Sequence, residues 1–347
     1  MAAPMRVGIL NDISDDPSFI GVDRWIELAA DDLQRAGRLD RDVELVVASG
    51  QGLPEGTAAA VERAHAELVD QDVLVVVGPA IGDNALAITP LVERLGVPTV
   101  NWSGAERARG ELMFHLQVGS HEDESIVLAR HLAGLGALRL GVVSDRSPIG
   151  RRHLEYLVAE AEVLGIQVAM SATVAPMAEE AETEVAAVLG GGVDAVVYLG
   201  LGLSAPAVAH ALATTGWDGP RAMNTAGMRG HQPGWADRIE GWTYVDMYAD
   251  DNLTLAALAE RVGPDGWNAM VAAVGYDLAR LVVEGLARAP ERTRAGVAEG
   301  LEQVKWLPAA EGHEGTLLGF GVRDRGALHG RYLVLRQWRA GVSTQVS

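Results

Sequence analysis

Short runs rich in β-branched residues alternate with helical patterns along most of the chain, at the steady spacing typical of βαβ units. This alternation restricts the fold more than any other feature, because a strand that returns after a helix pairs in parallel with an earlier strand. The first series has expected strands at 6–10, 43–47, 73–77 and 98–101, and expected helices at 19–36, 55–69 and 84–95.

A second series of the same kind follows an extended segment at 112–118 and a helix at 123–135. Its expected strands are 139–143, 167–173, 194–199 and 221–224, and its expected helices are 150–164, 179–189 and 205–214. The sequence therefore predicts an α/β protein with two doubly wound sheets, spanning roughly 5–118 and 121–248.

The last hundred residues have no sheet of their own. Expected helices at 253–262, 267–289 and 292–304 precede two extended runs at 316–322 and 332–338. Helices without a sheet must pack on an existing one. We therefore expect the chain to return to the first lobe and then to cross again. Lobe 1 is expected at 1–118 plus 250–324, and lobe 2 at 119–249 plus 325–347.

Bulk composition excludes several classes of partner. The formal net charge is −19 and no basic stripe is visible, which argues against nucleic acid. The chain has no cysteine, so disulfides and thiolate metal sites are excluded. No apolar run reaches the roughly 18 residues that a membrane span needs, so membrane insertion is not expected.

One glycine-rich motif suggests a nucleotide site. Gly200-Leu-Gly-Leu-Ser-Ala205 follows an expected strand and fits the G-x-G-x-x-A pattern of dinucleotide-binding folds. Such a fold also needs an acidic residue about 20 positions later, and residues 220–225 contain none. A Rossmann-type NAD-dependent enzyme is therefore the less favoured hypothesis for the function. Recognised catalytic motifs and metal-ligand spacings are missing from the sequence, so we expect no enzyme activity, cofactor or metal.

Two strand ends are better candidates for a binding site. The turn Gly78-Pro-Ala-Ile-Gly82 lacks a P-loop ending, but its main-chain N–H groups precede a helix start and suit a carboxylate or carbonyl. A plain turn is the alternative. The stretch Asn101-Trp-Ser-Gly-Ala105 places an aromatic ring beside a hydroxyl just past the next strand. The alternative there is that Trp102 belongs to the core.

Several short motifs occur together in a familiar order: Val7-Gly-Ile-Leu-Asn-Asp12, Val76-Val-Gly-Pro79, Gly96-Val-Pro-Thr-Val100, Ser144-Asp-Arg-Ser-Pro-Ile-Gly150, Tyr276-Asp-Leu-Ala279, and Gly315-Thr-Leu-Leu-Gly-Phe320 with Arg325-Gly326. In this order the chain resembles the type I periplasmic binding proteins, specifically the branched-chain amino-acid-binding group of ABC-transporter receptors. The resemblance covers essentially the whole chain. It implies two doubly wound Rossmann-like lobes joined by three crossover strands, with a ligand cleft between them.

The resemblance also implies binding residues. In the family, main-chain N–H groups and small hydroxyls of the first lobe hold the ligand carboxylate, and the opening loop contributes an aromatic residue. Carried over to this sequence, the first-lobe candidates are Phe19, Ile20, Ala80, Ile81, Gly82, Asn101, Trp102, Ser103 and Ala105. The second-lobe candidates are Ile149, Leu201, Thr225, Ala226 and Tyr248.

The second lobe departs from the amino-acid binders at three positions. Those proteins usually have a tyrosine, another aromatic residue and a glutamate where this chain has Ile149, Leu201 and Ala226. A buried ammonium without a carboxylate partner costs several kcal/mol. We therefore expect a ligand without a charged nitrogen, such as an apolar or aromatic carboxylate or an amide.

The function expected from the resemblance is a non-enzymatic solute receptor that closes by hinge motion on a small ligand and delivers it to an ABC permease. A cytoplasmic ligand sensor of the amide-regulator type is the alternative. The family implies an extracytoplasmic location, but residues 1–8 show neither a signal peptide nor a lipobox cysteine. The sequence leaves the compartment open.

Overall fold

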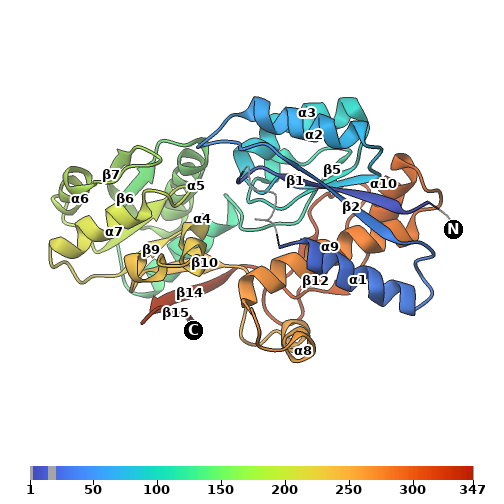
Figure 1. Ribbon diagram of the computed structural model, residues 1–347. Coiled ribbons are helices and arrows are strands. Elements are labelled where there is room, and N and C mark those ends of the chain that lie inside the picture. Colours follow the sequence, from blue (N-terminus) through green and yellow to red (C-terminus); the bar gives the residue numbers. More distant parts are fainter. Residues whose placement is uncertain (1–2, 15–20, 347) are drawn as a thin grey trace. The chain divides into compact units, whose positions relative to one another are not determined.

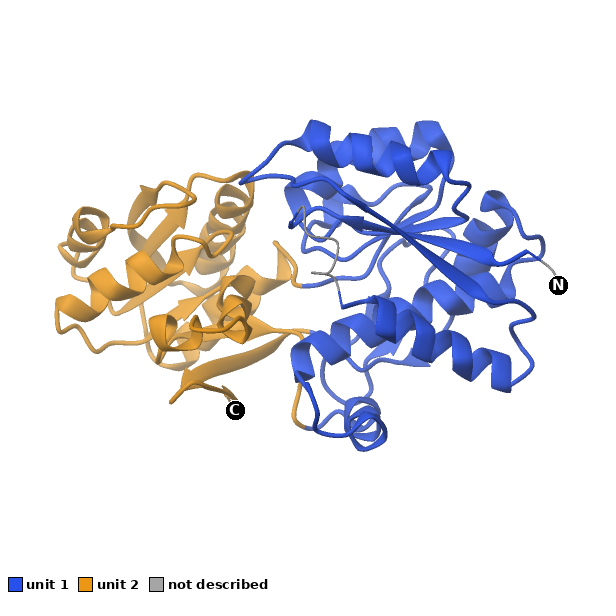
Figure 2. Cartoon of the chain, in the orientation of Figure 1, with its two compact units in different colours: residues 1–118, 251–332 blue, residues 119–250, 333–347 orange. Residues whose placement is uncertain are grey.

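The computed structural model describes residues 3–14 and 21–346. The chain divides into two compact units, which Figure 2 shows in different colours. Unit 1 comprises 1–118 and 251–332, and unit 2 comprises 119–250 and 333–347. The chain therefore passes from one unit to the other after residues 118, 250 and 332.

Unit 1 is built on a five-stranded parallel sheet. Its order is β2 (Val43–Ser49), β1 (Met5–Asn11), β3 (Val75–Val77), β4 (Thr99–Asn101) and β5 (Met113–His115). The chain adds strands to one side of β1 and then to the other, so the order reverses between β1 and β3. In doubly wound sheets, ligands bind at the carboxyl ends of the strands at this reversal point.

Helices cover both faces of this sheet. Figure 1 shows α2 (Ala58–Asp70) and α3 (Gly82–Leu95) on one face, and α1 (Asp23–Arg35) and α9 (Ala269–Arg288) on the other. Helices α1 and α9 approach closely because Gly275 has no side chain: a Cβ there would lie 2.3 Å from Cδ1 of Trp25. Unit 1 also contains α8 (Leu253–Val262), α10 (Arg294–Glu302), η2 (Glu106–Ala108) and a small antiparallel sheet of β11 (Leu307–Pro308), β12 (Leu317–Leu318) and β13 (Leu328–His329).

Unit 2 has a seven-stranded sheet with the same reversal. Its order is β7 (Gln167–Val174), β6 (Arg139–Asp145), β8 (Ala195–Leu199), β9 (Arg221–Met223), β10 (Thr243–Asp246), β14 (Val334–Arg339) and β15 (Val342–Gln345). The first five strands are parallel, and the last two are antiparallel additions from the end of the chain.

Alternate residues of β8 enter two different cores. Val196 and Tyr198 pack with α6 (Glu182–Leu189) and α7 (Ala205–Thr214), whereas Val197 and Leu199 pack with α4 (Asp123–Gly134) and α5 (Pro148–Leu164). This two-sided burial explains why the strand reads as a continuous apolar run. Two short helices, η3 (Thr225–His231) and η4 (Ala236–Ile239), follow β9.

The predicted α/β class with two doubly wound units is confirmed, but some boundaries differ. The last passage between units lies at 332/333 rather than at the expected 324/325. The reason is that the His115 N–H donates to the Arg325 carbonyl and the Ala327 N–H donates to the His115 carbonyl, which ties 325–327 to the edge of unit 1. The expected helix 55–69 begins at Ala58, because the Thr57 hydroxyl caps it by accepting the Ala60 N–H. Within the expected extended run 316–322, only Leu317–Leu318 is a strand.

Candidate ligand-binding turns

The turn after β3 is held by a buried carboxylate from the end of β1. Asp12 accepts hydrogen bonds from Ala80 N (2.8 Å), Ile81 N (3.0 Å) and Asn84 Nδ2 (2.8 Å). Burial raises the pKa of Asp12, and these hydrogen bonds act in the opposite direction. Asp12 thus stands at the reversal point of the sheet, where a ligand carboxylate was expected.

This arrangement changes the role of the predicted turn. The N–H groups of Ala80 and Ile81 are already used inside unit 1, so in this structure they are not open to a ligand. Gly82 begins α3, and a first-turn N–H has no acceptor within its own helix. Of the three predicted residues of this turn, Gly82 is the one that begins a helix, and its role as a ligand donor stays a prediction.

The second predicted turn, 101–105, is also closed by internal hydrogen bonds. The Ser103 hydroxyl donates to Asn101 Oδ1 (2.9 Å) and accepts the Ala105 N–H (3.3 Å). Asn101 in turn donates through Nδ2 to the Phe114 carbonyl (2.8 Å). The side chains of Asn101, Ser103 and Ala105 are buried, whereas Trp102 is only half-buried. Trp102 therefore offers the accessible apolar surface of this turn. Phe19 and Ile20 lie outside the described residues.

Unit 2 has the same arrangement as unit 1, with a carboxylate that accepts N–H groups of a turn. Asp145, at the end of β6, accepts hydrogen bonds from the N–H and hydroxyl of Ser147 and from Leu201 N (2.7 Å) in the turn after β8. Desolvation raises the pKa of Asp145, and the bonds from Ser147 and Leu201 oppose that rise. The same geometry, a carboxylate that bridges the two turns at the reversal point, thus occurs in each unit.

Two glycines leave room for Asp145. A Cβ on Gly200 would lie 2.2 Å from Asp145 Oδ2, and a Cβ on Gly150 would lie 2.5 Å from Oδ1. Real Cβ atoms essentially never approach other atoms this closely, so any larger residue would displace the carboxylate. Both glycines belong to the motifs noted in the sequence, and their role here is close packing around an internal anion.

The glycine-rich motif 200–205 does not present the donors of a nucleotide site. Its successive N–H groups donate to side chains: Gly200 to Asn224 Oδ1 (3.2 Å), Leu201 to Asp145 Oδ2, and Gly202 to the Tyr198 hydroxyl (3.3 Å). A pyrophosphate would have to displace all three partners. The alternative of an NAD-dependent enzyme is therefore not favoured.

Among the other predicted residues of unit 2, Thr225 contacts a further internal carboxylate. Thr225 donates through its N–H to Glu124 Oε2 (2.6 Å) and through its hydroxyl to Oε1 (3.2 Å), and Ala226 is buried. Ile149 is buried and Leu201 is half-buried. The ring of Tyr248 is covered by the Arg336 guanidinium, 3.9 Å from its centroid.

Sequence reasoning did not single out Asp12, Glu124 and Asp145 as anchors of these turns. A usable signal was present for two of them, because Asp12 and Asp145 each stand where the first strand of a lobe ends. Glu124 gave no such signal: it lies in the first turn of α4 and meets Thr225 only through the tertiary fold.

Two doubly wound units that exchange the chain three times, each with small-residue turns at its reversal point, define a two-domain α/β ligand-binding protein. The family model described as periplasmic binding protein matches residues 4–335. The chain therefore belongs to the periplasmic binding protein family. No helix in the described ranges is long and apolar enough to cross a membrane.

Solved structures share the fold at low sequence identity. A type 1 periplasmic binding protein from Bordetella pertussis superposes with a TM-score of 0.83 and 17% identity, covering 99% of this chain and 100% of the other. The leucine-binding protein LivK from Thermotoga maritima gives a TM-score of 0.79 and 16% identity, covering 99% and 98%. A solute-binding protein of an ABC transporter from Rhodopseudomonas palustris, in complex with 4-hydroxybenzoate, gives 0.78 and 14%, covering 99% and 96%. No curated protein matches the sequence.

Proposed function

We propose that the protein is a non-enzymatic solute receptor of an ABC importer that binds a small apolar or aromatic carboxylate or amide. Family membership supports the receptor role. Among proteins of the same fold are a leucine-binding receptor, a 4-hydroxybenzoate-binding receptor and a putative branched-chain amino acid ABC transporter protein from Rhodospirillum rubrum. These neighbours favour a transport receptor over a ligand sensor.

The proposed ligand class rests on one observation: three buried carboxylates of unit 2 accept hydrogen bonds from the protein itself. Glu124, Asp145 and Asp246 stand near the carboxyl ends of its parallel strands, and each accepts hydrogen bonds from the protein itself. Glu124 is engaged by Thr225, Asp145 by Leu201 and Ser147, and Asp246 by His231, Tyr244 and the Met247 N–H. Their oxygens are buried and already hydrogen-bonded.

An amino acid would bring an ammonium group that needs such a partner. Diverting one of these carboxylates would leave main-chain donors unsatisfied, at about 1–3 kcal/mol for each buried group. A ligand without a charged nitrogen avoids that cost. Trp102, Ile149 and Leu201 would supply its apolar contacts, and Gly82 a main-chain donor.

Thermal unfolding in the presence of single compounds tests the ligand class. At a concentration of 100 times Kd, a ligand stabilises the folded state by about 2.7 kcal/mol. We expect 4-hydroxybenzoate or benzamide to raise the melting temperature measurably, and L-leucine to leave it unchanged. Saturable binding of leucine by titration calorimetry, without binding of either aromatic compound, would contradict the proposal.

Replacing Trp102 tests the position of the site. We expect Trp102→Ala to weaken binding of the responding compound about tenfold or more, because the aromatic contact surface is lost. Trp306→Ala is the matched control, since Trp306 is 65% exposed in another part of unit 1. Equal affinity of the two variants would place the site elsewhere.

Hinge motion is part of the same proposal. Small-angle X-ray scattering with and without the responding compound should show a smaller radius of gyration in its presence. An unchanged scattering curve at saturation would argue against closure while leaving the ligand class intact.

A further inference from the structure

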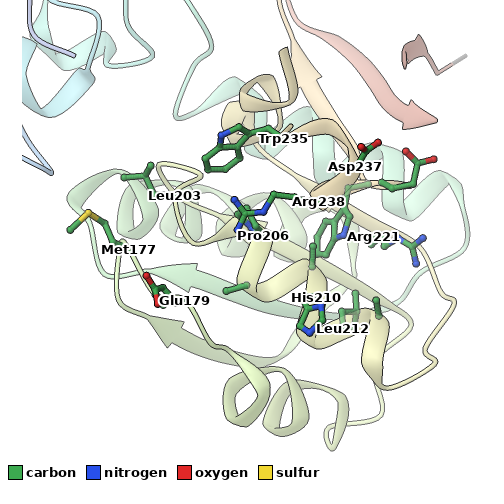
Figure 3. Close-up of a pocket in the computed structure, with 16 residues that line it drawn as sticks. Met177, Glu179, Leu203, Pro206, His210, Leu212, Arg221, Trp235, Asp237 and Arg238 are labelled. Carbon is green, nitrogen blue, oxygen red and sulfur yellow. The ribbon is translucent and has the colours of Figure 1, made fainter. Parts of the chain in front are cut away.

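A hollow in unit 2 is lined by Leu203 of the motif 200–205 and by residues outside the turns described above. It has a volume of about 750 Å³ and runs between α7, η4 and the loop that precedes α6. Figure 3 shows Trp235 and Arg238 on one side, Pro206 and His210 of α7 on another, and Arg221 at one end. Arg221 is the first residue of β9, so this end lies at the amino edge of the sheet. The turns of the candidate site lie at the carboxyl edge.

Arg221 carries a donor that the protein does not satisfy. Its Nε atom is buried and has no hydrogen-bond partner, and within the described part of the chain its guanidinium forms no ion pair. A buried donor of this kind costs about 1–3 kcal/mol unless an acceptor reaches it. Buried unsatisfied groups are uncommon in native proteins, and a bound water or ion is one of their ordinary explanations.

A second cation and two tryptophans face the same hollow. The Arg238 guanidinium lies 5.3 Å from the Trp235 ring centroid and, among the described residues, has no carboxylate partner. Trp242 is buried beneath it, at 2% exposure. Along α7, the small residues Pro206, Ala209 and Ala213 lie three or four positions apart and so share one face. This face admits a flat or extended apolar group.

The remaining charges limit the charge of the occupant. Glu179, Asp237 and Glu240 also line the hollow, and all three are exposed. Carboxylates at the rim repel a group with several negative charges, whereas a single negative charge can pair with Arg221. From these observations we infer that the hollow is a second binding site, selective for a small amphipathic organic monoanion. The anionic group binds Arg221, and the apolar part lies along α7 towards Trp235.

The test uses the fluorescent monoanion 8-anilinonaphthalene-1-sulfonate and its uncharged analogue N-phenyl-1-naphthylamine on the full chain. We expect saturable binding of the anion, weakened about tenfold by Arg221→Gln because a charge-assisted hydrogen bond is lost. Arg94→Gln is the matched control: Arg94 is exposed in the last turn of α3 and belongs to unit 1. The control should bind the anion as the unmodified protein does.

A second variant keeps the inference testable if Arg221→Gln does not fold. Ala213 is exposed on α7, so Ala213→Phe fills the hollow without disturbing the core. The number of anion molecules bound per protein should fall by one. The melting temperature measured by circular dichroism should equal that of the unmodified protein within experimental error. Binding that is unaffected by both substitutions, equal binding of the uncharged analogue, or no saturable binding up to about 1 mM would overturn the inference.

Discussion

Three histidines are buried as neutral groups, each in a different packing environment. Desolvation lowers the pKa of His65 to about 4, of His115 to about 3 and of His153 to about 3. Nearby arginines act in the same direction: Arg294 for His65, Arg109 for His115 and Arg152 for His153. In the folded protein all three imidazoles therefore remain uncharged well below their usual range.

These histidines predict acid sensitivity. The unfolded chain takes up a proton on each near pH 6.5, whereas the folded chain does not, so stability falls as the pH drops below 6.5. Between pH 7.5 and pH 5 the loss from one such histidine is about 2 kcal/mol. Urea denaturation at the two pH values should show this loss. His65→Gln should show a smaller difference between the two pH values, and an unchanged difference would refute the assignment to His65.

At the level of single residues, the sequence indicated where the two glycine- and serine-containing turns lie better than it indicated their internal hydrogen bonds. The motifs at 78–82 and 101–105 do lie at strand ends of one sheet. What local patterns could not show is that Asp12 takes the donors of Ala80 and Ile81, because these residues are about 70 positions apart and meet only after β1 and β3 pair. The acceptor of these two N–H groups is thus a side chain of the protein, Asp12, and not a ligand.

Among the elements, the turn after β8 is closely packed around the carboxylate of Asp145. Gly200 has no unusual backbone angle, so alanine would be accepted there but for the contact of its Cβ with Asp145 Oδ2. The requirement for glycine is therefore steric rather than conformational.

This packing predicts a local effect of one added methyl group. Gly200→Ala should lower the free energy of unfolding by about 1–3 kcal/mol, as expected for overpacking. The matched control is Gly134→Ala: Gly134 lies within α4, and its Cβ would meet nothing within 4 Å, so this change should be neutral or slightly stabilising. Chemical denaturation of both variants provides the comparison, and equal stability would show that Asp145 moves freely.

Long periodic elements were predictable, whereas short ones stabilised by tertiary contacts were not. The expected helix 267–289 is observed as Ala269–Arg288, because its apolar pattern extends over several turns. The small sheet β11–β12–β13 consists of two-residue strands, too short for any period to register. The helices η3 and η4 are short as well, and η3 begins where Glu124 holds Thr225.

At the level of the whole molecule, each unit is completed by a segment from a distant part of the chain. Unit 2 receives its last two strands from 333–347, and Trp338 stacks on Tyr244 with a ring separation of 5.5 Å. Its indole N–H donates to the Gly227 carbonyl (2.9 Å). Without this segment, β10 is left as an open edge strand and the aromatic stack is lost.

Because unit 2 is built from two separate segments of the chain, its folding in isolation can be predicted. Residues 119–250 should not fold cooperatively, whereas 119–250 joined to 333–347 by a short Gly/Ser linker should. The linker can be short because β10 and β14 are antiparallel neighbours, with Asp246 opposite Val334. Size-exclusion chromatography and circular dichroism melting distinguish the outcomes. A cooperative transition in the shorter fragment would show that the last strands are dispensable.

The three passages between units also bear on biosynthesis. A ribosome adds about 5–20 residues per second from the amino end. When residue 250 has been made, unit 1 still lacks α8, α9 and α10, and unit 2 still lacks β14 and β15. Unit 1 therefore lacks part of its helical cover until 251–332 have been made, and unit 2 lacks its last two strands until 333–347 have been made. Such a chain stays unfolded for longer than one built from two consecutive domains.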